Sequence, residues 1–368
     1  MTLNIAVVGL GIGTEHVAAL RQLPENYRLH TLCDLNEELG QSLCKENSAS
    51  HFTSNIDEVF NSSEIDIVDI CLPPHLHLGA ILKALQSGKH VVCEKPLVTS
   101  LSELDQLERT VKQTGRQVFP VFQYRFGPAA VQLLTLMDKG VAGRPLVASL
   151  ETHWDRDKDY YDIPWRGTWA GEQGGAILTH AIHSHDWLTW ILGPVKSVYA
   201  NLATRVNSIE VEDCAALSFE MQSGALASSS ITLGAAGDSS RLRFCFSELS
   251  AESGRSPYAP ASEEWVFTSR SPDKQKEIDA LVQSSVSTNP QVDAGYLGFF
   301  RAISAELDAG SLGGSGSQAE IPVVTLQDAR QSIELATAIY ASSRSNSRVE
   351  LPLTADHPLY KGWVPAKT

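Results

Sequence analysis

The sequence predicts two domains: a doubly wound α/β domain, followed by an α+β domain with a large, open and mostly antiparallel sheet. The chain has 368 residues, about twice the usual size of a single domain. Its first third alternates short apolar runs with helical patterns, which is typical of parallel strands joined by right-handed crossovers. Beyond residue 122 the apolar runs follow one another at hairpin spacing, which indicates antiparallel pairing. We therefore expect the domains to comprise residues 1–122 and 123–368.

In the first domain the apolar runs are short, and the segments between them have apolar residues at helical spacing. The first run leads into glycines, and the second ends at Asp34. The expected strands are 3–8, 29–33, 65–72, 90–93 and 117–122, and the expected helices are 15–23, 36–45, 77–86 and 102–114.

The second domain is expected to begin with a helix at 128–139. Its strands are then predicted at 146–152, 195–204, 214–220, 225–233 and 242–246, and its later helices at 298–307 and 326–341. Gln222-Ser223-Gly224 predicts a hairpin turn between two of these strands. The segment GSLGGSGSQ at 310–318 is a flexible loop by composition.

The composition limits the partners that the protein can have. There are 29 Lys and Arg against 43 Asp and Glu, a formal net charge of −14, which repels nucleic acids and anionic bilayers. The six cysteines are scattered and form no CxxC pair, which favours reduced thiols over disulfides or a structural metal site. No run has the length of a membrane span, and the N-terminus has no basic signal-peptide region. We expect a cytoplasmic protein that binds no nucleic acid, no membrane and no metal.

A glycine-rich turn, GLGIGT at residues 9–14, lies between the first predicted strand and the first helix. In dinucleotide-binding folds such a turn lets the backbone approach the pyrophosphate, and the helix N-terminus offers free N–H groups. Thr14 stands where a third glycine or alanine is usual, with Gly13 one residue earlier. Asp34 follows 20 residues after Thr14, where a carboxylate accepts from the ribose 2′-OH and repels a 2′-phosphate. We expect a Rossmann domain that binds NAD, with NADP less favoured, through Gly9, Gly11, Ile12, Gly13, Thr14 and Asp34. A turn without a ligand is the alternative.

Two further segments follow predicted strands of the same parallel sheet. They contain Leu72, Pro73 and His77 after one strand, and Glu94, Lys95 and Pro96 after another. Because the carboxyl ends of parallel strands line the ligand crevice, we expect these residues to face the cofactor. A lysine there can donate a hydrogen bond to a substrate oxygen and stabilise developing negative charge. The alternative for Lys95 is a solvent-exposed lysine at a strand end.

Three histidines, His180, His183 and His185, lie within six residues. If this segment is one helix, Thr179, His183 and Asp186 share a stripe at positions i, i+4 and i+7. A histidine oriented by a neighbour can transfer a proton at neutral pH. Two alternatives remain for these histidines. They could be metal ligands, although no HExxH spacing accompanies them, or hydrogen-bonded interior side chains.

Several of these features stand in register along the chain: GLGIGT, Asp34, Pro73 with His77, Glu94-Lys95-Pro96, and Gly174-Gly175 leading to His183 and Asp186. In this combination the sequence resembles the glucose-fructose oxidoreductase / inositol dehydrogenase (Gfo/Idh/MocA) family over nearly its whole length. The resemblance implies a Rossmann domain and a second domain whose open sheet makes dimer or tetramer contacts. It also implies NAD(P)-dependent oxidation or reduction at a carbon of a sugar or cyclitol.

By position, Lys95 resembles the family's active-site lysine and His183 its catalytic histidine. Trp165 and Arg166 resemble the cofactor-contacting pair ahead of the glycines. Many members carry an aspartate four residues before the histidine, where this chain has Thr179. A neutral hydroxyl can orient His183 but cannot stabilise an imidazolium by charge. The catalytic residues implied are therefore Lys95, His183 and Thr179.

The substrate side is less clearly marked. The charged segment DRDKDYYDI at 155–163 is either a solvated loop or a cap on a sugar site, formed by Tyr160, Tyr161 or Asp162. Strand ends and the family resemblance add further candidates. The expected substrate contacts are Lys95, Arg125, His153, Tyr161, His180 and His183.

The sequence thus predicts an NAD-dependent oxidoreductase that transfers a hydride between nicotinamide and a secondary alcohol or ketone of a sugar, sugar derivative or cyclitol. It is expected to be a homodimer or homotetramer through the second-domain sheet. Two alternatives remain. One is an NAD-dependent glycoside hydrolase that uses transient oxidation, and the other is a non-catalytic dinucleotide-binding sensor.

Overall fold

The computed structural model describes residues 2–47, 49–288, 292–311 and 321–365. Contacts divide the chain into two compact units, and neither is continuous in sequence. The first consists of Met1–Val98, Glu103–Val121 and Tyr296–Ala329, and the second of Thr99–Ser102, Phe122–Gly295 and Arg330–Thr368. Of the loop predicted at 310–318, the first two residues end a helix and the rest lie outside the described residues. Within the described ranges, no helix is long and apolar enough to cross a membrane.

The first unit contains a six-stranded, wholly parallel sheet with the strand order β3-β2-β1-β4-β5-β6. The order reverses between β1 and β4, which is where doubly wound folds bind dinucleotides. The strands are β1 (Leu3–Val8), β2 (Tyr27–Cys33), β3 (His51–Thr53), β4 (Ile67–Ile70), β5 (His90–Cys93) and β6 (Val118–Pro120). The helices are α1 (Gly13–Leu20), α2 (Glu37–Asn47), α3 (Ile56–Asn61), the 3-10 helix η1 (Pro74–Leu76), α4 (His77–Gln86) and α5 (Leu101–Thr114). The predicted Rossmann fold is confirmed.

Besides η1, two short elements of this unit were not predicted from the sequence. The strand β3 has three residues and pairs on one side only, with β2. The helix α3 has six residues, and its N-cap Asn55 accepts a hydrogen bond from the Asp57 N–H at 3.1 Å. Both are too short for a period of 2 or 3.6 residues to be recognised in the sequence.

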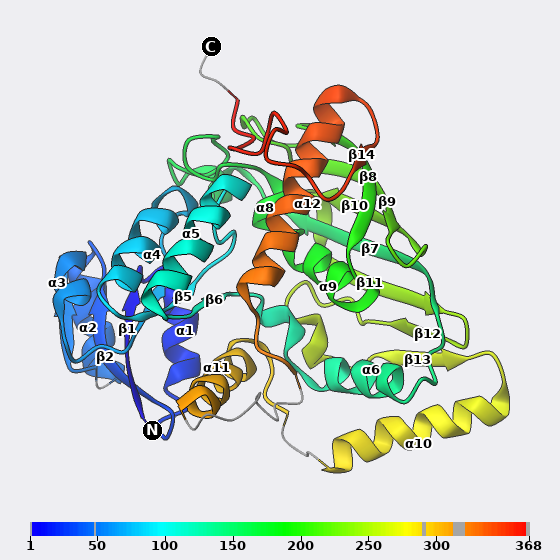
Figure 1. The fold of residues 1–368 in the computed structure, drawn as a ribbon, viewed down its shortest axis with the longest axis horizontal. Coiled ribbons are helices and arrows are strands. Elements are labelled where there is room, and N and C mark those ends of the chain that lie inside the picture. Colours follow the sequence, from blue (N-terminus) through cyan, green and yellow to red (C-terminus); the bar gives the residue numbers. More distant parts are fainter. Residues whose placement is uncertain (1, 48, 289–291, 312–320, 366–368) are drawn as a thin grey trace. The chain divides into compact units, whose positions relative to one another are not determined.

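Residues 296–329 pack with the first unit, although the sequence places them in the second domain. They include most of α11 (Gly295–Ser311), which is drawn in orange beside the blue α1 in Figure 1. Phe299 and Phe300 are fully buried, and the Tyr27 hydroxyl donates to the Phe300 carbonyl at 2.6 Å. Burial of two phenylalanine side chains contributes several kcal/mol, about 1.5–3 for each, so this helix is part of the first unit's core.

The second unit contains an eight-stranded sheet with the order β13-β12-β11-β7-β10-β9-β8-β14. Only β7 and β10 are parallel neighbours, and the other pairs are antiparallel. The strands are β7 (Pro145–Asp155), β8 (Val195–Ala203), β9 (Cys214–Met221), β10 (Leu226–Thr232), β11 (Gly234–Phe246), β12 (Leu249–Glu252), β13 (Val266–Ser269) and β14 (Val349–Glu350). At the predicted hairpin turn the Gly224 N–H donates to the Met221 carbonyl at 2.9 Å. The predicted open, mostly antiparallel sheet is confirmed.

Helices cover one face of this sheet. They include α8 (Ala176–Thr179), α9 (Ile182–Leu192) and α12 (Leu326–Ser345). The described residues also form the helices η2 (Gln123–Arg125), α6 (Pro128–Asp138), α7 (Lys158–Tyr161), η3 (Pro260–Ser262) and α10 (Pro272–Thr288). Thr152 of β7 faces α9, with its hydroxyl 3.2 Å from that of Ser184. On the opposite face Val147, Tyr199 and Leu226 are 36–56% exposed. Alternation along each strand therefore separates a buried face from an open one.

Candidate functional site

The glycine turn of the first unit has the geometry that a bound pyrophosphate requires. Gly9 has φ +92°, and a Cβ there would lie 2.6 Å from the Cys71 carbonyl oxygen, so only glycine fits. A Cβ on Gly11, by contrast, would meet nothing within 4 Å. This space lies at the N-terminus of α1, where N–H groups and the helix dipole attract anions. The residues present therefore fit a dinucleotide.

Gly13 takes over the packing role of the usual third glycine. A Cβ at this position would lie 3.1 Å from Cγ1 of Val7 and 3.4 Å from Cβ of Cys71, so the missing side chain allows α1 to pack closely on β1. The Thr14 hydroxyl, which stands at the usual third position, donates to the Gly11 carbonyl at 2.9 Å. The departure from the GxGxxG pattern is thus accommodated within the turn.

Asp34, at the end of β2, is fixed against this turn. Its Oδ2 accepts from the Leu10 N–H at 2.6 Å, and its Oδ1 accepts from the Asn36 N–H at 2.8 Å. The side chain is half-buried. A carboxylate is therefore held beside the glycine turn, in the place where the sequence predicts a contact with the ribose.

His77 holds together the two segments that follow β4 and β5. It is fully buried, with Nε2 2.7 Å from the Leu72 carbonyl oxygen and Nδ1 2.9 Å from that of Pro96. No surface of His77 is exposed, and a direct contact with the cofactor stays a prediction. Burial lowers the pKa of this imidazole. The side chain braces Leu72 and the Glu94-Lys95-Pro96 segment.

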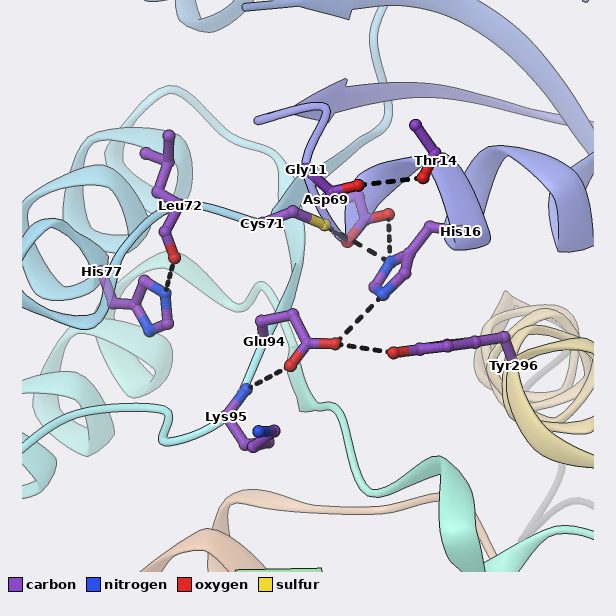
Figure 2. Close-up of polar contacts among 10 residues, drawn as sticks. All are labelled: Gly11, Thr14, His16, Asp69, Cys71, Leu72, His77, Glu94, Lys95 and Tyr296. Carbon is purple, nitrogen blue, oxygen red and sulfur yellow. Dashed lines mark hydrogen bonds and ion pairs between the residues drawn. The ribbon is translucent and has the colours of Figure 1, made fainter. Parts of the chain in front are cut away.

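Glu94 is bound by donors from three parts of the first unit, as Figure 2 shows. Its Oε2 accepts from the Lys95 backbone N–H at 3.0 Å. Its Oε1 accepts from the Tyr296 hydroxyl at 3.1 Å and lies 3.2 Å from Nε2 of His16. The other ring nitrogen of His16, Nδ1, lies 2.8 Å from Oδ2 of Asp69. The backbone that carries Lys95 is thus fixed by a buried polar network that the sequence did not reveal.

In the second unit, His183 lies near the start of α9 between aromatic rings. The ring of Tyr124 stacks on it at 4.1 Å, and the ring of Phe122 meets it edge-on at 6.0 Å. These two aromatic residues were not singled out in the sequence. Their position immediately before the predicted helix at 128–139 carries no local signal for the contact. Packing of this kind fixes the plane of the imidazole.

The segment that carries the three histidines is not one continuous helix, which was the condition for the shared stripe of Thr179, His183 and Asp186. α8 ends at Thr179, and α9 begins at Ile182, because His180 has φ −125° and lies outside helical geometry. The Thr179 hydroxyl contacts the neighbouring His180 and Gly175. It lies 2.6 Å from Nδ1 of His180 and donates to the Gly175 carbonyl at 2.9 Å.

Glu212 explains the two glycines that precede the histidines. A Cβ on Gly175 would lie 2.0 Å from the Glu212 carbonyl oxygen, and one on Gly174 would lie 2.5 Å from the Tyr340 hydroxyl. Oε1 of Glu212 accepts from the N–H groups of Gly175 and Ile177 at 3.1 and 3.2 Å, and from the Tyr340 hydroxyl at 2.9 Å. This buried carboxyl therefore caps the N-terminus of α8. Burial raises its pKa to about 7.

The raised pKa of Glu212 predicts a pH-dependent stability of the second unit. The ordinary value is 4.5 and the folded value about 7, so between these limits the folded state holds a proton that the unfolded chain has released. The free energy of unfolding should therefore fall as pH rises through this window, by about 3 kcal/mol. Urea unfolding at pH 5 and pH 8, followed by tryptophan fluorescence, measures the fall.

Glu212→Gln should remove this part of the pH dependence, because glutamine does not titrate. Glu277→Gln, an exchange at an exposed position of α10, should retain it. All seven tryptophans lie in the second unit, so the fluorescence reports on that unit. Equal pH dependence in the Glu212→Gln variant and the unsubstituted protein would contradict the assignment.

Two of the predicted substrate residues are engaged elsewhere. Arg125 is 3% exposed and bound to Asp186, with Nε–Oδ2 and Nη2–Oδ1 distances of 2.7 and 2.5 Å, so its guanidinium serves a buried ion pair. His153 points to the open face of the sheet and bonds to Ser230 at 2.9 Å. Its neighbour Trp154 faces inward instead. These contacts account for the position of both side chains, and substrate contacts by Arg125 and His153 stay predictions.

A group of aromatic side chains surrounds His180. The ring of Trp154 meets it edge-on at 4.9 Å, and that of Tyr160 lies 5.8 Å away. The Arg166 guanidinium lies 3.9 Å above Tyr160 and 5.5 Å from Trp165. Tyr161 lies behind Tyr160, with the two rings 4.9 Å apart. The strict alternation in Thr152-His153-Trp154 is the sequence signal that could have placed Trp154 inward.

The third histidine, His185, is an interior side chain. It is buried, with Nε2 3.2 Å from the Ser229 hydroxyl, and burial lowers its pKa to about 4. In the described parts of the chain, the side-chain groups whose geometry could hold a metal ion are His16 with Asp69 and Cys71, and His30 with His51 and Glu64. None of the three clustered histidines belongs to either group.

Comparison with known proteins gives matches in both halves of the chain. A model of an oxidoreductase family with an NAD-binding Rossmann fold, GFO/IDH/MocA, matches residues 3–122, and the GFO/IDH/MocA C-terminal domain matches residues 131–252. An uncharacterized oxidoreductase of Synechocystis sp. is 29% identical over 213 residues, 55% of this chain and 55% of the relative. Levoglucosan dehydrogenase of Pseudarthrobacter phenanthrenivorans is 26% identical over 212 residues, 55% of this chain and 54% of the relative.

Inositol 2-dehydrogenase/D-chiro-inositol 3-dehydrogenase of Lactiplantibacillus plantarum is 24% identical over 231 residues, 60% of this chain and 62% of the relative. The chain thus spans between about half and two thirds of the length of these curated relatives. Among solved structures, the WlbA dehydrogenase from Bordetella pertussis, in complex with NADH and UDP-GlcNAcA, has a TM-score of 0.80 and 26% identity. That match covers 96% of this chain and 99% of the other.

Proposed function

The chain belongs to the GFO/IDH/MocA oxidoreductase family, and from this premise we propose that it is an NAD-dependent dehydrogenase of a sugar, sugar derivative or cyclitol. The reaction is hydride transfer between the cofactor and a secondary alcohol or ketone. One observation carries the proposal. An open glycine turn and a lysine on a braced backbone segment follow β1 and β5, at the carboxyl edge of the same parallel sheet.

The first unit would hold the dinucleotide through backbone and carboxylate groups. The N–H groups around Gly11 and Thr14 would bind the pyrophosphate at the start of α1, and Asp34 would accept from the adenosine ribose. Leu72 and Pro73 would border the cofactor after β4. When bound, the nicotinamide accepts the hydride from the carbinol carbon in the oxidation direction.

Lys95 and His183 would carry out the acid–base part of the reaction. Lys95 would donate a hydrogen bond to the reacting oxygen and stabilise its negative charge. His183, fixed by the stacked Tyr124 ring, would take the hydroxyl proton. Trp165 and Arg166 would contribute to cofactor binding, and His180, oriented by Thr179, would contact substrate hydroxyl groups together with Tyr160 or Tyr161.

A panel of free sugars, cyclitols, sugar acids and nucleotide-linked sugars, read by NADH absorbance, tests the proposed reaction. The levoglucosan, inositol and UDP-sugar ligands in the relatives' names set the first compounds of the panel. Reduction of NAD with at least one member of the panel is expected. Release of an aglycone from glycosides without net NADH would instead identify the hydrolase alternative, and NADH binding without turnover on any compound would identify a sensor.

Asp34 predicts the choice between NAD and NADP. A carboxylate fixed beside the ribose repels a 2′-phosphate, so kcat/KM should be higher with NAD, by about tenfold or more, since tenfold corresponds to only about 1.4 kcal/mol. Asp34→Asn keeps an oxygen that can accept from the Leu10 N–H but removes the charge, and should reduce this ratio. A preference for NADP in the unsubstituted protein would overturn the prediction.

We also propose that the open face of the second unit's sheet joins copies of this chain. Val147, Tyr199 and Leu226 are exposed around a shallow hollow of about 470 Å³ on this face. An exposed apolar surface on a sheet favours association. Light scattering should give the mass of a dimer or tetramer, and a monomer at micromolar concentration would exclude the proposal.

A further inference from the structure

His16 lies between two carboxylates in the interior of the first unit (Figure 2). Its Nδ1 is 2.8 Å from Asp69, its Nε2 is 3.2 Å from Glu94, and the exposed fraction of its side chain is zero. Asp69 is also fully buried, and Glu94 is 6% exposed. An ionised carboxylate so far from water requires a positively charged or hydrogen-bonded partner.

The geometry determines the protonation of this imidazole. Both ring nitrogens face carboxyl oxygens, and ionised carboxylates only accept hydrogen bonds, so an imidazolium with both nitrogens protonated satisfies both contacts at once. Burial by itself lowers the pKa of His16, but the charge of Asp69 and its hydrogen bond raise that pKa well above its ordinary value. This environment favours the imidazolium form of His16, whose positive charge would offset part of the buried negative charge.

The contact with Glu94 connects His16 to the backbone of Lys95. Each oxygen of the Glu94 carboxylate has a separate task. Oε2 accepts from the Lys95 N–H, while Oε1 is held by His16 and by the Tyr296 hydroxyl. Rotation of this carboxylate would release the Lys95 N–H. His16 is three residues into α1, so the same short helix carries both the glycine turn and the group that fixes Glu94.

We propose that His16 is a positioning residue, an imidazolium whose Nε2–H holds the Glu94 carboxylate in the orientation that fixes the Lys95 backbone. This inference rests on the proposed role of Lys95. His16 touches neither substrate nor cofactor in this account. It acts through Glu94, and it couples the helix of the glycine turn to the segment that carries the lysine.

A pair of amide variants tests the proposal. The side-chain N–H of Gln reaches about as far as Nε2 of histidine, and that of Asn about as far as Nδ1, so His16→Gln keeps a donor toward Glu94 while His16→Asn keeps one toward Asp69. Both variants remove the charge. His16→Asn should lower kcat by about 10–100-fold, the loss expected for a misplacement of about 1 Å. His16→Gln should retain most of kcat.

The KM for the carbohydrate and the NADH affinity, measured by fluorescence, should change little in either variant. Tyr296→Phe removes the other donor to Oε1 and should cause a smaller loss of kcat than His16→Asn. Equal losses in the Gln and Asn variants would show that His16 serves stability alone and would overturn the proposal.

A spectroscopic measurement on the unsubstituted protein does not depend on how the variants fold. With ¹⁵N-labelled histidine, both ring nitrogens of His16 should be protonated at pH 8, whereas ordinary histidines are neutral there. The groups that face this ring are Asp69, Cys71, Glu94 and Tyr296. An unprotonated Nδ1 or Nε2 at pH 8, whether through a neutral tautomer or a bound metal ion, would overturn the proposal.

The two proposals can fail separately. A fully active Lys95→Ala variant would refute the catalytic role of Lys95. His16 would then have no catalytic lysine to position, whatever its spectrum shows. If Lys95→Ala is inactive but the Asn and Gln variants behave alike, the dehydrogenase proposal stands and the inference about His16 fails.

Discussion

Replacing Lys95 with alanine is expected to lower kcat by about 100- to 1000-fold, the usual cost of removing a donor that stabilises charge at a reacting oxygen. The side chain is proposed to act on the substrate oxygen alone. The backbone contacts that brace this segment, from Lys95 N–H to Glu94 and from Pro96 O to His77, do not involve it. NADH affinity should therefore be nearly unchanged, and steady-state kinetics combined with fluorescence titration measures both quantities.

Lys83→Ala is the matched control for this experiment. Lys83 lies on α4, is 60% exposed and pairs with Asp57 at the surface. Such an exposed pair contributes about 1 kcal/mol or less to stability. No role in the reaction is proposed for Lys83, so its loss should change kcat by less than a factor of two. A Lys95→Ala variant with the activity of this control would refute the assignment of the lysine.

Asp186→Asn is expected to destabilise the second unit by about 3–5 kcal/mol. Arg125 and Asp186 are 3% and 1% exposed in their side chains, and the aspartate accepts two hydrogen bonds from the guanidinium. Removing one charge leaves the other buried and uncompensated, which is the costly way to break such a pair. The guanidinium also lies 5.0 Å above the Trp190 ring, so tryptophan fluorescence in a urea titration detects the change directly.

Asp162→Asn provides the comparison for that measurement. Asp162 pairs with Lys158 on the surface, where the two side chains are 58% and 83% exposed, and an exposed pair contributes about 0–1 kcal/mol. The same chemical exchange should therefore cost several kcal/mol at one site and almost nothing at the other. Similar unfolding midpoints for the two variants would mean that the Arg125–Asp186 pair is not a buried charge pair.

The sequence predicted the fold because regular elements leave a local pattern. The helix at 77–86 and the strand at 90–93 have the predicted bounds, since each is long enough, or sharply enough bounded, to be recognised. The glycine turn and the Glu94-Lys95-Pro96 segment could be identified for the same reason, because each is a continuous run of residues. Each run stands directly after a strand, as the strand–turn–helix connection of this fold requires.

Contacts between distant residues could not be predicted in this way. Arg125 and Asp186 are 61 residues apart, and Glu94 and Tyr296 are 202 apart, so no local pattern signals either contact. The residues next to His16 in the sequence do not mark it as part of a site. Its role depends on Asp69 and Glu94, which the folded sheet places beside it. Glu212 accepts from the Gly175 N–H at the start of α8 although the two residues are 37 apart in the sequence.

Residues 296–329 belong to the first unit although most of the second unit precedes them in the sequence. This order affects how the protein folds during synthesis. During synthesis the ribosome releases the whole parallel sheet, and then most of the second unit, before α11 emerges. Until then the surface that Phe299 and Phe300 cover stays exposed on an unfinished first unit, in the period when a nascent chain is open to chaperones and to aggregation. A shortened chain that ends near residue 122 would keep that surface exposed permanently, so the dinucleotide-binding part of this protein is not a self-sufficient module that can be transplanted on its own.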